Sequence, residues 1–103
     1  MISSFVITNE TSNRNLDAFF THLWKKNDRV KLIIDATACT NISLGKVLSM
    51  KSVLDKHRDN SRDNIDFSVI FVKNKFVRQI IRLGLFFIKT ERPVFVEVAS
   101  NLK

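Results

Sequence analysis

The segment Val30–Ala36 constrains the fold of this chain most. Its centre, Leu32-Ile33-Ile34, is a run of bulky apolar residues with no polar residue between them. A strand with one face in water alternates apolar and polar residues, whereas a strand covered on both faces reads as a continuous apolar run. The segment therefore predicts a central strand of a parallel sheet, buried on both faces.

Three further segments have the composition of strands. Ile65–Val72 is rich in Phe, Val and Ile, and Val94–Val98 follows Pro93, which a strand tolerates best at its start. Residues 2–8 contain a Phe-Val-Ile run and could pair antiparallel at an edge of the sheet. We therefore expect four strands, of which at least three are parallel.

Helical periodicity fills the gaps between these strands. Apolar residues recur every three or four positions within residues 16–24, 44–54 and 76–85. Thr11 or Ser12 is placed to cap the first helix and Ser43 the second, which should run to about Arg58 before a polar turn at residues 59–64. Gly84 marks either the end of the third helix or a close approach to the sheet.

The order β-α-β-α-β-α-β predicts an α/β fold in which three helices pack on a mostly parallel four-stranded sheet. With 2 Gly and 1 Pro in 103 residues, the chain offers no flexible linker, and we expect one domain over residues 1–103.

Several function classes are excluded by what the chain contains. Cys39 is the single cysteine, so no disulfide forms within the chain. Together with His22 and His57 it supplies three cysteine and histidine ligands, fewer than the four that a structural zinc site uses. Gly45 and Gly84 are the only glycines, so neither nucleotide-binding glycine loop is present. The chain shows no signal-peptide pattern, and its apolar run at residues 83–88 is too short to span a membrane. We expect a cytoplasmic, soluble protein without cofactor or metal.

Residues 30–85 combine these features in a particular order. A hydrophobic strand ends in Asp35, a short loop follows, Ile42-Ser43-Leu44-Gly45 opens a helix, and a later helix ends in Gly84-Leu85. This order resembles the STAS domain, the fold of anti-sigma factor antagonists and of the cytoplasmic tails of anion transporters. The resemblance implies a STAS-like fold and a non-catalytic protein-interaction module with a regulatory role. It also implies a phosphorylated serine at the start of that helix, where Ser43 is the matching residue.

The segment from Asn41 to Lys46 is therefore the first candidate for contact with a partner. A phosphate on Ser43 would face free backbone N–H groups and the positive end of the helix dipole, with Lys46 near in sequence. Ser43 can equally serve as an N-cap alone. Asp35 ends the central strand, where open α/β sheets bind ligands, and it can equally cap the following loop.

Two further candidates lie in the third helix. The formal net charge is +7, and four cations there could contact nucleic-acid phosphates or simply form a solvated face: Lys73, Lys75, Arg78 and Arg82. Codon bias can account for part of this lysine content. Phe86 and Phe87 either pack under the sheet or form an exposed apolar interface for a partner or a second copy. A nucleic-acid-binding protein and a self-associating structural protein are thus the alternatives to an interaction module, and the absence of a catalytic constellation argues against an enzyme.

Overall fold

Four strands form one sheet in the computed structural model, which describes residues 1–99. They are β1 (Ile2–Val6), β2 (Val30–Ala36), β3 (Ile65–Val72) and β4 (Val94–Val98). The strands lie side by side in chain order and every neighbouring pair is parallel. The predicted α/β fold and parallel four-stranded sheet are confirmed, and the antiparallel alternative for β1 is wrong.

The connections between the strands are helical. α1 (Asn13–Trp24) joins β1 to β2, and α5 (Lys75–Ile88) joins β3 to β4. Ser12 rather than Thr11 caps α1, with its hydroxyl accepting a hydrogen bond from the Asn15 N–H.

The connection between β2 and β3 differs from the single predicted helix. It consists of three short helices, α2 (Leu44–Ser49), α3 (Lys51–Lys56) and α4 (Arg58–Asn64). The polar turn predicted at residues 59–64 is therefore wrong, because α4 occupies it. α4 buries none of its residues and so lacks the apolar stripe that marks a helix in a sequence. An ion pair between Arg62 and Asp59, one turn apart, spans this helix.

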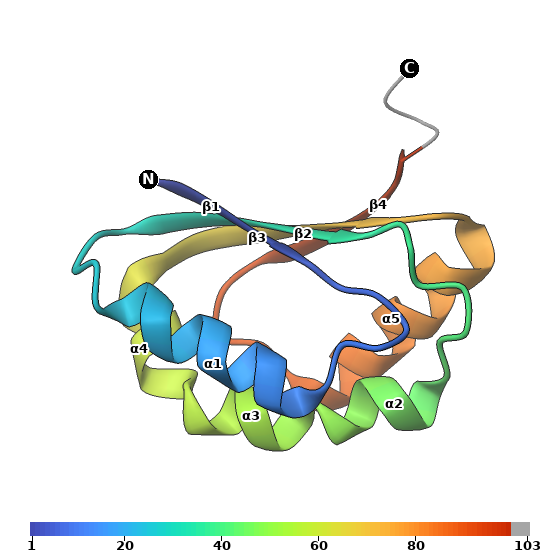
Figure 1. Ribbon diagram of the computed structural model, residues 1–103, viewed down its shortest axis with the longest axis horizontal. Coiled ribbons are helices and arrows are strands. Elements are labelled where there is room, and N and C mark those ends of the chain that lie inside the picture. The colour runs from blue at the N-terminus through green and yellow to red at the C-terminus, as the bar shows by residue number, and fades with distance from the viewer. Residues whose placement is uncertain (100–103) are drawn as a thin grey trace.

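All of these helices lie on one face of the sheet (Figure 1). Crossovers between parallel strands are right-handed almost without exception, so a sheet whose strand order follows the chain keeps each helix on the same side. The other face is uncovered within residues 1–99. The prediction that β2 is buried on both faces is therefore wrong: Leu32, which faces the helices, is 2% exposed, whereas Ile33 on the other face is only partly buried.

The layer between sheet and helices contains two clusters of buried apolar side chains. One surrounds Val72 of β3, the other surrounds Leu32 of β2, and Leu54 of α3 packs against both. α5 approaches α2 closely at Gly84, where an added Cβ would overlap the side chain of Val47. Gly84 thus serves a close approach to α2, and neither ends α5 nor meets the sheet.

Candidate functional site

The segment from Asn41 to Lys46 is held against the loop that precedes α1. The Asn41 N–H donates to Asn9 Oδ1 at 3.1 Å, and Lys46 Nζ donates to the Asn9 carbonyl at 3.1 Å. Ser43 is the N-cap of α2, because its hydroxyl accepts a hydrogen bond from the Lys46 N–H at 3.2 Å. The predicted cap is confirmed, and modification of Ser43 stays a prediction.

Asp35 caps the loop that follows β2. Its Oδ1 accepts hydrogen bonds from the Thr37 hydroxyl at 2.7 Å and from the Thr37 N–H at 3.0 Å. These two bonds, the hydroxyl first, hold the pKa of the Asp35 carboxyl below its ordinary value. The predicted role as a loop cap is confirmed, and the charge is retained at neutral pH.

The four cations near the start of α5 do not all remain free. Arg78 is partly buried, and its Nε donates to the Val96 carbonyl at 3.0 Å, which ties α5 to β4. Lys73, Lys75 and Arg82 are exposed. One of the four predicted phosphate contacts is therefore engaged in the fold.

The outward side of α5 carries an apolar surface. Phe86 and Phe87 are 74% and 54% exposed, so the interpretation of these two residues as core is wrong. Phe76 and Leu83 are 70% and 45% exposed and lie seven residues apart, on the same side of the helix. We call Phe76, Leu83, Phe86 and Phe87 the α5 patch. Sequence analysis offered Phe86 and Phe87 as an exposed interface, as one of two alternatives, but did not add Phe76 and Leu83. α5 also buries Val77, Ile81 and Ile88 on another side, so its apolar residues do not single out one face.

The uncovered side of the sheet is a second apolar surface, which sequence analysis did not foresee. Side chains alternate between the two faces of a strand, so the residues of β2 between the buried ones point away from the helices. The same alternation holds in the other strands. We call these residues the open face: Ile2, Ser4, Val6, Lys31, Ile33, Asp35, Phe67, Val69, Phe71, Phe95 and Glu97.

Apolar side chains dominate the middle of the open face. The register aligns Ile33 with Val69 and Val69 with Phe95, so these three form a row across β2, β3 and β4. Phe95 is 52% exposed, and its ring meets the edge of the Phe67 ring at a centroid distance of 6.2 Å. Ile2 and Val6 extend the apolar surface onto β1 and are 72% and 58% exposed.

A bulge decides which side chains of β3 reach the open face. Val30 pairs with Ile65 but Lys31 pairs with Phe67, so Asp66 is an extra residue on β3. Ile65 therefore belongs to the core cluster around Leu32, whereas Phe67 points to the opposite side.

A buried histidine joins the helices to one another. His57 is 5% exposed and accepts a hydrogen bond at Nδ1 from Trp24 Nε1 at 3.0 Å, which leaves the ring proton on Nε2, 2.6 Å from Asp17 Oδ1. The bonds from His57 and then from Lys56 lower the pKa of the Asp17 carboxyl. Both ring nitrogens are thus engaged within the fold, and the arrangement links α1 to α3 instead of presenting a base to a substrate.

Cys39 is a buried, free cysteine. Its Sγ lies 3.3 Å from the Ile7 carbonyl as a donor, and burial raises the pKa of its thiol. Within residues 1–99 no three His, Cys, Asp or Glu side chains gather into a group that could hold a metal ion. In the same part of the chain, none of the helices has the length and apolar character needed to cross a membrane.

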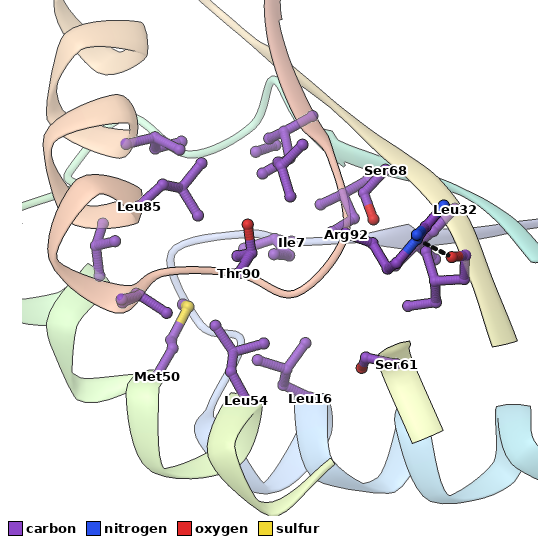
Figure 2. Close-up of a pocket in the computed structure, with 18 of the residues that line it drawn as sticks. Ile7, Leu16, Leu32, Met50, Leu54, Ser61, Ser68, Leu85, Thr90 and Arg92 are labelled. Atoms are coloured by element: carbon purple, nitrogen blue, oxygen red, sulfur yellow. Dashed lines mark hydrogen bonds between the residues drawn. The ribbon is translucent and has the colours of Figure 1, made fainter. Parts of the chain in front are cut away.

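A cavity of about 150 Å³ lies between the helices and the sheet (Figure 2). It is lined on the helix side by Leu16, Met50 and Leu54 and on the sheet side by Leu32 and Ser68.

Comparison with known proteins gives no match: no family model, no curated protein and no solved structure is similar to this chain.

Proposed function

We propose that this protein is a non-catalytic interaction module that buries the open face of its sheet against a second copy of itself. The observation that carries the proposal is a parallel sheet with one face uncovered and apolar. Parallel sheets occur almost only with both faces covered, because their side chains are apolar on both. An exposed apolar surface of this kind on a folded domain is typical of an interaction site.

The charges on β2 favour a second copy as the partner. Lys31, Ile33 and Asp35 follow one another along the same side of the strand, with the apolar residue in the middle. A two-fold axis that lies between two such sheets and crosses the strands at Ile33 reverses the strand direction. It brings Ile33 opposite its own copy and sets Lys31 of each chain opposite Asp35 of the other.

This arrangement uses groups that the single chain leaves available. Both hydrogen bonds from Thr37 go to Oδ1 of Asp35, so Oδ2 accepts none from residues 1–99. Glu97 lies on β4 at the same end of the open face as Asp35, since Asp35 and Glu97 both pair with Phe71. The acidic end of one sheet therefore meets the basic end of the other, and such isologous contacts are the commonest in homo-oligomers.

Light scattering coupled to size-exclusion chromatography over a range of concentrations tests the proposal. We expect a dimer mass that falls to the monomer mass in Ile33→Asp, because the substitution places two carboxylates at the centre of the interface. Phe87→Asp, an apolar-to-acid change at a more exposed position on α5, is the control and leaves the dimer intact. A chain that stays monomeric at every concentration contradicts the proposal.

Charge exchange tests the orientation of the two copies. Lys31→Glu and Asp35→Lys should each weaken the dimer, because each sets like charges opposite one another. The double variant Lys31→Glu/Asp35→Lys restores the pairing with the signs exchanged and should recover most of the dimer. Failure of the double variant to recover the dimer, although it remains folded, rules out this orientation.

The α5 patch is a second candidate interface, favoured by the 74% exposure of Phe86. It would bind a protein partner or a second copy through apolar side chains flanked by the exposed cations Lys75 and Arg82. If Phe87→Asp dissociates the dimer and Ile33→Asp does not, the α5 patch is the interface. The resemblance to the STAS family agrees with an interaction module of either kind and stays a prediction, as do the contacts proposed for residues 41–46 and for nucleic acid.

A further inference from the structure

We infer that the cavity between the helices and the sheet is a binding site for a small, neutral, apolar molecule that carries a single hydroxyl group. The inference does not depend on how the open face is covered, because the cavity lies on the opposite side of the sheet. It rests on the construction of the cavity, its one deeply buried polar group and its size.

The cavity interrupts the core at the middle of the sheet. Ile34 of β2 and Ile70 of β3 are paired neighbours that face the helices, yet both are only partly buried. Side chains in this position normally pack against the helices without a gap. Here the two core clusters lie on either side of the gap, and Leu54 is the residue that packs against both.

The rim of the cavity is polar and reaches the surface. The exposed residues Thr90 and Glu91, in the loop before β4, belong to its lining. Arg58 of α4 forms an ion pair with Glu91 at 2.8 Å across this rim. Arg92 lies beside it and donates from Nε to the Ile65 carbonyl at 3.0 Å (Figure 2). A ligand therefore has a route from solvent, while the interior beyond the rim is apolar.

One polar group lies deep in the lining. Ser68 of β3 is 7% exposed and lines the cavity next to Leu32 (Figure 2). Its backbone N–H donates to the Pro93 carbonyl at 2.9 Å. Within residues 1–99 no fully buried side-chain nitrogen or oxygen lacks a hydrogen-bond partner, so the Ser68 hydroxyl is accessible from the cavity that it lines. A hydroxyl group on a mostly apolar cavity wall marks where a polar atom of a ligand would lie.

Size and polarity together define the ligand class. An apolar cavity of roughly this volume takes up benzene in another protein, so the ligand has about the bulk of one ring or of a six-carbon chain. A charged ligand is disfavoured in the interior, because the charged residues of the lining lie at the rim, where Arg58 and Arg92 are engaged by Glu91 and by backbone carbonyls and Lys89 is exposed. A single hydroxyl opposite Ser68 would pair with the most deeply buried hydroxyl of the lining, since Ser61 is only partly buried and Thr90 is exposed.

Benzene and phenol are a matched pair of probes that differ by one hydroxyl. We expect both to shift the δ1 methyl signals of Ile34 and Ile70 in a methyl NMR titration, with phenol binding more tightly. Ile33 is adjacent to Ile34 but points to the open face, and Ile2 is on the open face as well, so their methyl signals serve as internal controls. Shifts confined to Ile33 and Ile2, or no shift at millimolar probe, would overturn the inference.

Two kinds of variant make the result specific to the cavity. Ser68→Ala should weaken phenol about fivefold, as expected for one neutral hydrogen bond, and leave benzene within about twofold. Leu54→Phe should fill the cavity and abolish binding of both probes. If Leu54→Phe does not fold, Ile34→Phe is used instead, and binding is then followed through the methyl signal of Ile70. Equal affinity of phenol for the wild type and Ser68→Ala, or undiminished benzene binding in a folded filled variant, contradicts the site.

Discussion

The two faces of the sheet carry similar apolar side chains but differ in whether helices cover them. Leu32 and Ile33 are adjacent on β2 and similar in size, yet Leu32 is 2% exposed and Ile33 is only partly buried. The helices cover one face and leave the other free (Figure 1). Apolar character alone therefore does not say whether a residue stabilises the single chain or an association between chains.

The face that the helices cover is incompletely packed. It contains a cavity of about 150 Å³, whereas the open face contains the aligned apolar row of Ile33, Val69 and Phe95. The covered face contains the buried core of the chain. The proposals above place contact with a second copy on the open face and a ligand site in the cavity on the covered face. The following predictions test this separation.

Truncation of neighbouring residues on β2 should give the largest contrast. Leu32→Ala removes a fully buried side chain and should lower the free energy of unfolding by about 3 kcal/mol. Ile33→Ala, measured on the dissociated chain, should lower it by about 1 kcal/mol or less, because this residue packs on one side only. Urea unfolding of both variants at low protein concentration measures the difference. Equal losses would mean that the open face contributes to the monomer as much as the core does.

Gly84 tests how tightly the helix layer is packed. In Gly84→Ala the new methyl group would overlap Val47, and we expect a loss of about 2 kcal/mol. Gly45→Ala is the matched control, since its methyl group meets only Ser43 Oγ at 3.9 Å and should stabilise α2 by a few tenths of a kcal/mol or more. Thermal unfolding of both variants and of Gly84→Ala/Val47→Ala, which should recover part of the loss, provides the measurement.

The cap of α2 should have a smaller effect. Ser43→Ala removes the acceptor for the Lys46 N–H and should cost about 1 kcal/mol. Ser43→Thr and Ser43→Asp retain an acceptor and should cost less than half as much. If Ser43→Ala leaves the unfolding midpoint in urea unchanged, the cap does not stabilise the helix layer.

Acid should weaken the link between α1 and α3. The folded-state pKa of Asp17 is held below its ordinary value of 3.8, so the stability that this carboxylate contributes is fully present above the unfolded pKa. It is lost as the pH falls from about 3.8 through the folded value. Asp17→Asn should flatten the pH dependence of the melting temperature in this range only in part, because Asp35 and Asp55 also have lowered pKa values. An unchanged profile would show that His57 and Lys56 do not stabilise the ionised form.

Much of the fold was predictable from local pattern. The strands β2, β3 and β4 were found because apolar and β-branched residues cluster between polar breaks, and α1 and α5 because their apolar residues recur with helical spacing. α4 was not predicted because it is polar on every side. Its residues form a helix without contributing to the core. The roles of Ser43 and Asp35 as caps were predictable, since a capping hydrogen bond joins residues two or three apart in the chain.

The candidate surfaces were not predictable to the same extent. Phe76 has helical spacing with core residues yet is 70% exposed, because α5 contacts α2 along only one side. Sequence analysis did not find the open face, because Phe67, Val69 and Phe71 are at least as apolar as Ser68 and Ile70, the residues between them that face the helices.

The sequence by itself determined the strands β2, β3 and β4, the helices α1 and α5 and the caps at Ser43 and Asp35, because these depend on interactions between residues close in the chain. The alternation of strands with helices indicated a mostly parallel sheet, because a helical crossover returns the chain to the same end of the sheet. Only the tertiary structure decided that all helices share one face, that Gly84 faces Val47 and that a cavity separates the two core clusters. These features depend on which strands become neighbours and in which register. The same apolar pattern on β2 would serve a sheet covered on both faces and a sheet covered on one, so the pattern alone does not distinguish them.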